Sequence, residues 1–540
     1  MQNEIFDAII IGGGPAGVHA AIPLIEEGLN VGMLDGGMTG DEKLNENFKE
    51  NFEEIRKRRK DQFRLFLGDE LSGIPILDKK ASHSSMMTSG SREYVSKNTE
   101  EFLPIKDAQV QIIQSLAKGG LAEAWGGACD IFSEGELKAV GIPVEKTREY
   151  YQTIVDRIGI SGDSEKIKLQ PPINLDHNGE SILKKYLKNK TNSEFTIKKP
   201  VLALLTKNLG DRKATNYHDT EYWLNQGFSV YRPSHTIDKL RENANFTYLP
   251  GNVASTVNKI GKINLIKTIS ISNKKENIFK AKYVVLAAGS INTNRILLRS
   301  FNLYNIPTPF IIKTNLLIPC LNLSTLGQAG LQKRSSLSQL FMIDKNSIAG
   351  MSRSFSQFYS YKSLLFFKLI PYSPLAVPET LDLLGLFSQS VVIVDVRFPS
   401  FLDLKNTIAL KKGSANNDYL LINNIKKPEN NTNVVRKIVK FLFSLGLIPL
   451  KVVRTPDGST AHYASGIPFI KQGERYALNA DDNGKLLEND SIYIADASTW
   501  RALPARPPAL TIMMNAYRIG KGIANLQKRQ GYSFMNADSA

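Results

Sequence analysis

The sequence predicts an α/β protein built around a dinucleotide-binding unit, and three observations support this. A glycine-rich loop lies between a strand pattern and a helix pattern near the first residue. Two later segments repeat the order of short apolar strand, small residues and helix. The 540 residues are 42% hydrophobic and 22% charged, which indicates a globular protein and not a disordered or fibrous one. At roughly 150 residues per domain, length alone suggests three or four domains.

The first segment has the order of a βαβ unit. Residues 6–11 are apolar and predict a buried strand, residues 16–28 predict a helix, and residues 30–34 predict a second strand. The pattern G-x-G-x-x-G stands between the first strand and the helix. Because all the parts follow in order, we expect a nucleotide site and not a plain glycine turn. The place near the start of the chain favours FAD over NAD.

Each glycine of this loop has a physical use. Gly12 permits the tight turn, Gly14 lets the backbone approach a pyrophosphate, and Gly17 lets the helix pack on the strand. Asp35 ends the second strand at the spacing expected for an acid that accepts hydrogen bonds from a ribose. The neighbouring residues expected at the same site are Pro15, Ala16 and Gly36.

Three later segments agree with a nucleotide site. In residues 118–130, KGGLAEAWGGACD, two glycine pairs flank Trp125, which suits a flat or anionic ligand, although a tight turn over a core tryptophan also fits. Residues 283–287 predict a strand that turns into a helix through Ala288 and Gly289. Residues 492–495 predict another strand, which Asp496 follows, and a helix begins near Leu510.

The middle of the chain carries weaker patterns. Strands are expected at 246–249, 252–257, 390–398 and 450–453, and an apolar helix at 437–445.

Two further segments are amphipathic or apolar. Aromatic residues at near-helical spacing predict one amphipathic helix over 48–66 that packs on the body. The apolar, proline-broken run 363–387 fits either a core segment or a patch that dips into a membrane.

Composition limits the classes of protein and compartment. Two cysteines, Cys129 and Cys320, cannot build a disulfide framework or a thiolate metal site, and no metal-spaced cluster of other ligands is expected. No apolar stretch reaches the ~18 residues of a spanning helix, and no secretory signal is expected, so we expect a cytoplasmic protein. The net charge of +16 leaves an anionic substrate or peripheral contact with an anionic membrane open. Nucleic acid is disfavoured because no aromatic-basic binding motif is present.

Taken together, the segments around 12–17, 118–130, 281–298 and 491–520 resemble the glucose-methanol-choline (GMC) oxidoreductase family. The pyranose-oxidase-like and bacterial choline-dehydrogenase-like branch is the most similar. The resemblance implies an α/β fold, α+β overall. A Rossmann-type FAD-binding domain is interleaved with a substrate-binding domain that holds a largely antiparallel sheet covered by helices. The implied FAD-binding domain comprises residues 1–40, 105–145, 235–300 and 480–530, the substrate-binding domain 150–235 and 300–475, and an inserted helical or loop segment 41–104.

The resemblance also implies how the cofactor is held. Pyranose oxidases link FAD to a histidine just before the loop tryptophan, whereas this chain has Ala124 there, so FAD is expected to bind non-covalently. The implied FAD-binding residues are Gly12, Gly14, Pro15, Ala16, Gly17, Asp35, Gly36, Gly120, Leu121, Trp125, Gly126, Gly127, Ala128, Val253, Ala288, Gly289, Asp496, Ala497, Pro508, Leu510 and Thr511.

His462 matches the family's catalytic base, which assists hydride transfer to flavin N5 by taking the hydroxyl proton. The family usually places Asn or His before the proline of N-P-x-x-T, but this chain has Pro507 there. Tyr463, Arg506, Arg501 or Thr511 would then have to orient the substrate, and the first two are placed with His462 in the predicted catalytic set.

These residues support three candidate functions to different degrees. The leading hypothesis is an FAD-dependent enzyme that oxidises a hydroxyl of a sugar, polyol or glycosylated or lipid-linked natural product, with oxygen, a quinone or a protein as electron acceptor. The alternative is a flavin-binding protein with altered or lost alcohol chemistry that acts through a partner. A flavin-dependent RNA modifier is disfavoured because residues 491–520 resemble alcohol oxidoreductases.

Overall fold

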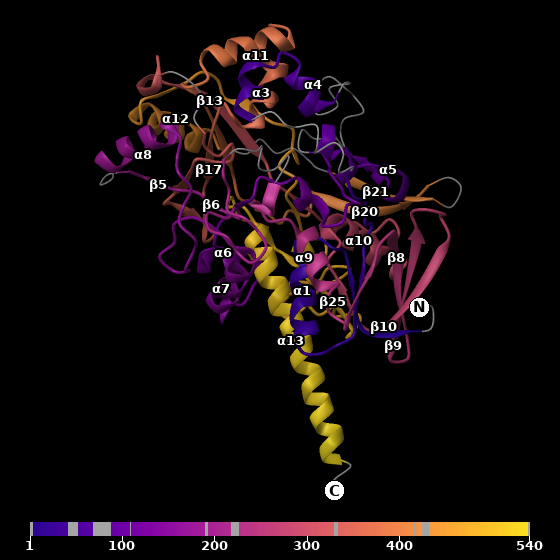
Figure 1. The fold of residues 1–540 in the computed structure, drawn as a ribbon. Helices are drawn as coiled ribbons and strands as arrows, with labels where there is room; N and C mark the ends of the chain where they lie inside the picture. Colours follow the sequence, from indigo (N-terminus) through magenta and orange to yellow (C-terminus); the bar gives the residue numbers. More distant parts are fainter. Residues whose placement is uncertain are drawn as a thin grey trace.

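The computed structural model describes residues 4–40, 52–68, 88–107, 110–189, 193–217, 226–328, 333–413, 417–423 and 431–537. Two large sheets organise these residues, and Figure 1 shows the first strands and the last helix of the chain in the same part of the molecule. Segments from both ends and from the middle of the chain therefore build one unit around the first sheet.

Parallel strands form the centre of the first sheet, in the order β7, β2, β1, β10 and β25. Their bounds are Ile5–Ile11 for β1, Val31–Leu34 for β2, Phe246–Leu249 for β7, Glu276–Leu286 for β10 and Ile492–Ile494 for β25. These strands confirm the predictions, although β10 begins seven residues before the expected start at Tyr283. The carboxyl ends of parallel strands meet at one edge, which is where such sheets bind ligands.

An antiparallel extension explains the extra length of β10. Its first half pairs with β9 (Ile263–Ser270), and β9 pairs with β8 (Asn252–Ile260), while only its second half pairs with β25. The predicted strand at 252–257 thus continues to Ile260, because the hairpin gives its polar residues backbone partners.

Three helices start near the carboxyl edge of the parallel strands. They are α1 (Pro15–Glu26), α10 (Gly289–Ser300) and α13 (Ala509–Ala537), and α13 runs beside α1 before it projects from the body in Figure 1. A Cβ atom at Gly520 would lie 2.3 Å from the carbonyl oxygen of Ala20, so glycine permits the close approach of these two helices.

The second sheet is antiparallel throughout, in the order β22, β13, β18, β17, β14 and β5, with β23 also paired to β13. This sheet confirms the predicted fold class. The strand bounds are Phe195–Lys198 (β5), Asn315–Asn322 (β13), Leu340–Asp344 (β14), Phe355–Ser360 (β17), Val391–Arg397 (β18), Leu447–Pro449 (β22) and Val453–Arg454 (β23).

Helices and smaller strands surround the two sheets. The helices are α6 (Glu134–Val140), α7 (Thr147–Ile158), α8 (His177–Lys188), α9 (Pro233–Leu240), α11 (Val377–Leu386) and α12 (Thr432–Ser444). The smaller strands include β3 (Ile105–Asp107), β20 (Thr407–Lys412) and β21 (Asp418–Asn423), which pair with one another. The predicted helix at 437–445 corresponds to α12, which begins five residues earlier.

The predicted strand at 450–453 is wrong. Two short strands, one on each side of this stretch, pair with β13. Pro449 lies opposite Cys320 in the first pairing, and Val453 lies opposite Leu317 in the second. Leu450 is 62% exposed between them, so its apolar side chain does not mark a buried strand.

The single helix predicted over 48–66 is also wrong. Where the structure describes this stretch, it forms α3 (Phe52–Arg58) and α4 (Gln62–Leu67), separated by a turn, and residues 41–51 lie outside the described part. Phe52, Ile55 and Phe66 are nevertheless buried in the core beneath the antiparallel sheet. The apolar spacing therefore predicted burial correctly and helix continuity incorrectly.

The run 363–387 divides into a buried part and an exposed part. Leu364, Phe367 and Ile370 are buried, whereas Leu383 and Leu386, on α11, are 47% and 81% exposed. Among the described residues, no helix has both the length and the apolarity needed to cross a bilayer. Peripheral membrane contact stays a prediction. Because α11 itself carries acidic residues, attraction to anionic lipid would have to come from other elements.

The contact between α1 and α13 makes a prediction about two glycines of one helix. We expect Gly520→Ala to lower the free energy of unfolding by about 1–3 kcal/mol, because the added methyl overlaps the Ala20 carbonyl. Gly522→Ala is the matched control: no atom lies within 4 Å of its added methyl, so better helix propensity should raise stability by about 0.5–1 kcal/mol. Urea denaturation of both variants measures the difference, and equal shifts would contradict close packing at Gly520.

Candidate cofactor-binding and active site

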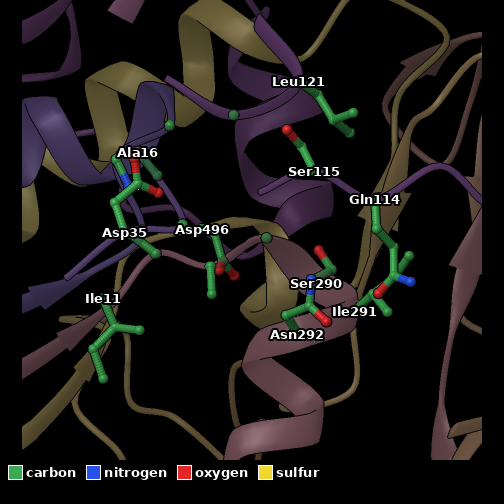
Figure 2. A pocket seen from close by; sticks show the side chains of 18 of the residues that line it. Ile11, Ala16, Asp35, Gln114, Ser115, Leu121, Ser290, Ile291, Asn292 and Asp496 are labelled. Carbon is green, nitrogen blue, oxygen red and sulfur yellow. The ribbon is translucent and has the colours of Figure 1, made fainter. Parts of the chain in front are cut away.

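An elongated pocket lies where the strands of the first sheet end and α1, α10 and α13 begin. In Figure 2, Asp35 and Ala16 lie on one side, Gln114 and Asn292 on the other, and Asp496 between them. The predicted residues that line it are Gly12, Gly14, Pro15, Ala16, Asp35, Gly36, Gly120, Leu121, Val253, Ala288, Gly289, Tyr463, Asp496 and Ala497. The pocket thus brings together segments that lie almost 500 residues apart.

Helix N-termini with no capping side chain face this pocket. Gly14 is the N-cap of α1 and Ala288 that of α10, and neither helix has a side-chain cap or an acidic residue in its first turn. The first turn of α13 carries no acidic residue either. Free N–H groups and a positive dipole end suit phosphate, so these helix starts fit an anionic ligand.

Glycines allow the backbone to converge here. Gly12 has a φ of +106°, and a Cβ atom there would lie 2.5 Å from the carbonyl oxygen of Ala287, the residue after β10. Gly17 does not line the pocket. A Cβ on it would lie 1.8 Å from the oxygen of Gly12, so it serves the packing of α1 on β1.

Asp35 is a buried carboxylate at the end of β2. It accepts hydrogen bonds from the Gly13 N–H at 3.3 Å and from the Tyr248 hydroxyl at 2.9 Å. Burial raises its pKa to about 6, and the hydrogen bonds only partly offset that effect. A ligand that donated hydroxyl hydrogen bonds to Asp35 would favour its ionised form.

The glycine–tryptophan loop is held by its own side chains. Glu123 accepts hydrogen bonds from the N–H and hydroxyl of Ser234 on α9, and the Trp125 indole donates to the Tyr231 carbonyl at 2.7 Å. Gly120 and Leu121 line the pocket. Trp125, Gly126, Gly127 and Ala128 were expected at the cofactor but do not line this pocket; the indole instead anchors the loop.

Asp496 lies between the helix starts of α10 and α13. It accepts hydrogen bonds from the Thr293 hydroxyl at 2.6 Å and from the Ser498 N–H at 2.9 Å. Burial raises its pKa, although these donors oppose the shift. Asp496 therefore ties α10 to the turn after β25 while it lines the pocket.

Residues 113–116 also line the pocket, although no sequence motif pointed to them. Gln114 is buried, and its amide nitrogen donates to the Leu103 carbonyl at 2.8 Å, but its amide oxygen is buried without a partner among the described residues. This oxygen suits a ligand N–H. The segment has neither glycines nor a regular helix or strand, so no motif could have pointed to it.

His462 directly precedes a short strand, β24 (Tyr463–Ala464), that enters the site. Ala461 has a φ of +54°, which is uncommon for a residue with a side chain, and directs the two residues that follow it. Tyr463 lines the pocket, and its hydroxyl contacts the backbone of Gln111, Ile113 and Gly458. To orient a substrate as predicted, the Tyr463 hydroxyl would have to give up these hydrogen bonds.

The imidazole of His462 is half-buried and does not line the elongated pocket. Its Nδ1 is buried and finds no partner among the residues the structure describes. Burial, together with the charges of Lys313 and Arg397, lowers the pKa of His462 well below its usual range. The ring is therefore neutral at pH 7, which is the protonation state that a general base needs.

The turn that leads into α13 uses its polar side chains for structure. Arg506 is bound by two buried carboxylates, Asp130 and Glu136, which raise the pKa of the guanidinium. Thr511 shares a 2.6 Å hydrogen bond with the buried hydroxyl of Tyr151. Pro508, Leu510 and Thr511 do not line the pocket, whereas Ala509 and Ile512 of the same turn do.

Comparison with known proteins bears on the fold. The crystal structure of pyridoxine 4-oxidase from Mesorbium loti aligns with 96% of this chain and 99% of its own, with a TM-score of 0.57 and 12% sequence identity. The chain has the fold of pyridoxine 4-oxidase. This likeness over nearly the whole of both chains confirms the predicted fold class and agrees with the predicted resemblance.

The sequence comparisons add less than the structural one. No family model matches the chain. Thioredoxin reductase from Bacillus subtilis (strain 168) is 30% identical over 145 residues, which are 27% of this chain and 39% of that protein. The chain therefore matches less than half the length of this relative.

The partners of Arg506 predict a structural effect. We expect Arg506→Met to lower the free energy of unfolding by about 3–5 kcal/mol, because Glu136 would stay buried without its cation. Lys259→Met is the control, since Lys259 pairs with the exposed Asp490 and should cost about 0–1 kcal/mol. Chemical denaturation separates the two, and a fully stable Arg506→Met would contradict the structural role.

Proposed function

We propose that this chain is an FAD-dependent oxidoreductase of the GMC type that oxidises a hydroxyl group, with His462 as the base. Its substrate would be a small molecule such as a sugar, a polyol or a glycosylated or lipid-linked natural product. One observation carries the proposal: uncapped helix N-termini and the Asp35 carboxylate converge on a single elongated pocket, and the half-buried His462 follows a wall residue, Ala461.

The residues present fit FAD. The free amides at the start of α1 suit a pyrophosphate, and Asp35 suits the ribose hydroxyls. The unpartnered oxygen of Gln114 offers an acceptor to a ring N–H. Ala124, just before the loop tryptophan, has no side chain that could bond to a flavin, which supports non-covalent binding.

Bound FAD would supply the hydride acceptor for the reaction. The chain itself would supply the base: the neutral imidazole of His462 has an unprotonated ring nitrogen that can take the hydroxyl proton. The low pKa keeps this base ready at neutral pH but makes it a weak one, so correct placement of the substrate hydroxyl matters more here than basicity.

The residue before Pro508 supports the alternative function, in which the alcohol chemistry is altered or lost. Pro507 has no side-chain hydrogen-bonding group, and the expected substitutes are already engaged. Arg501 binds the Phe469 carbonyl, and Tyr463, Arg506 and Thr511 have the partners given above. A flavin-binding protein with altered or lost alcohol chemistry is therefore the second candidate.

Flavin reduction tests the two functions against each other. We expect the purified protein to release intact FAD on acid precipitation, and a panel of sugars, polyols and glycosides to include one that bleaches the bound flavin without oxygen. His462→Ala should slow that bleaching by about 10²–10⁴-fold, because the proton would lose its acceptor. Stopped-flow absorbance measures the rate. If no alcohol bleaches the flavin while dithionite does, the second candidate holds.

Asp35 predicts how FAD affinity depends on pH. Because burial raises its pKa to about 6, the carboxyl is protonated below that pH and loses an acceptor for the ribose hydroxyls. The FAD dissociation constant should therefore rise as pH falls from 7 to 5, by up to about tenfold per pH unit below the pKa. Fluorescence titration of the apoprotein measures it. Asp35→Asn should bind FAD more weakly at pH 7, with a flatter pH profile; an unchanged profile would exclude Asp35 as its origin.

A further inference from the structure

Lys313 lies directly opposite His462 on neighbouring strands. Strand β12 (Ile311–Ile312) pairs antiparallel with β24 (Tyr463–Ala464), and the Lys313 N–H donates to the His462 carbonyl at 3.2 Å one step beyond the paired residues. Residues opposite each other on antiparallel strands project their side chains to the same face. The lysine and the imidazole therefore share one face beside the turn that leads into α13.

The side-chain nitrogen of Lys313 is buried, and its partners among the described residues are backbone carbonyls. Its side chain is 0% exposed, and Nζ donates to the Arg506 carbonyl at 2.9 Å and to the Ala505 carbonyl at 3.4 Å. Within the described part of the chain, no carboxylate lies within ion-pair distance of Nζ. A buried cation without an acid is costly, and an apolar side chain could fill the same space, so this lysine is not explained by packing.

We propose that Lys313 is a positioning residue for His462, which fixes the turn before Pro507 against the imidazole and acts on the base through its charge. The inference rests on the proposed function and adds a residue to it.

The two hydrogen bonds of Lys313 explain how a proline can stand at position 507. A side chain at that position would have to supply the polar group next to His462, and Pro507 has none. Lys313 reaches the carbonyls of the two preceding residues from the neighbouring strand, so it holds the turn from outside it. The polar group beside the base is thereby supplied by the residue that follows β12 and not by the start of α13.

The charged groups around Lys313 and His462 determine the direction in which the lysine shifts the pKa of the imidazole. Arg397 on β18 also faces the pair, and the two nearby acids are committed elsewhere: Asp395 pairs with Arg397, and Glu136 with Arg506. Burial lowers the pKa of Lys313 and of His462 alike, so a state in which both side chains are positively charged is disfavoured. Two carbonyl acceptors favour the ammonium form of Lys313, so we expect the charge to reside on the lysine and His462 to stay neutral.

The test compares the titration of His462 in variants of the FAD-loaded protein. Lys313→Met removes the charge at similar volume, and the pKa of His462 should rise toward 6.5. Lys313→Arg should keep it low. Lys368→Met is the matched control, because Lys368 is also a lysine whose pKa burial lowers near Arg397, yet it does not act on His462. The measurement is the histidine ¹³Cε1 shift against pH, with His462→Gln to assign the signal.

A His462 titration that does not move in Lys313→Met overturns the proposal, and so does an equal shift in Lys368→Met. If Lys313→Met does not fold, as judged by circular dichroism and FAD content, Lys313→Gln replaces it with the same expected shift. With an alcohol that bleaches the flavin, the acid limb of kcat/KM should move up in step with the NMR shift. If no alcohol does so, the proposed function fails but the NMR result still decides the role of Lys313.

Discussion

The architecture depends on how closely the backbone of β1 approaches that of β10. Gly12 lies against the Ala287 carbonyl at the point where both parallel strands end, and a side chain there would push them apart. This contact sets the starts of α1 and α10 on one pocket, so two positive helix ends act on the same ligand. Segments far apart in sequence can build one site only because this approach is possible, and Gly17 extends the same close packing to α1 on β1.

Around that contact, some buried polar groups hydrogen-bond within the protein and connect its elements, whereas others are left for a ligand. Asp496 and Glu123 have their oxygens bound by neighbouring hydroxyl and N–H groups and tie helices to loops. The Gln114 oxygen and His462 Nδ1 have no partner in the part of the chain that the structure describes. Since an unmatched buried polar atom costs free energy, the oxygen of Gln114, a residue that lines the pocket, is suited to a ligand that donates a hydrogen bond there.

The sequence predicted most of the elements around the nucleotide site because each carries its own local pattern. The break between α3 and α4 escaped prediction because the turn there contains no glycine or proline, so apolar spacing continued across it. The anchoring of Trp125 could not be predicted, because a sequence does not show that its indole donates to the Tyr231 carbonyl; its contact with the cofactor stays a prediction. The role of Lys313 could not be predicted, because its position beside His462 depends on the pairing of two strands that lie about 150 residues apart in the sequence.

Arg506 and Lys313 differ in a way that stability alone does not explain. Both cations are largely buried beside the turn into α13, but Arg506 has two carboxylates and a raised pKa, whereas Lys313 has two carbonyls and a lowered one. A guanidinium paired in this way fixes geometry and leaves the local charge balanced. In its ammonium form, Lys313 would have no acid beside it among the described residues and would make the potential at His462 more positive, which adds to the effect of burial on that pKa. A proline at position 507 is then compatible with a working base, because the turn is held and the imidazole kept neutral from the opposite strand.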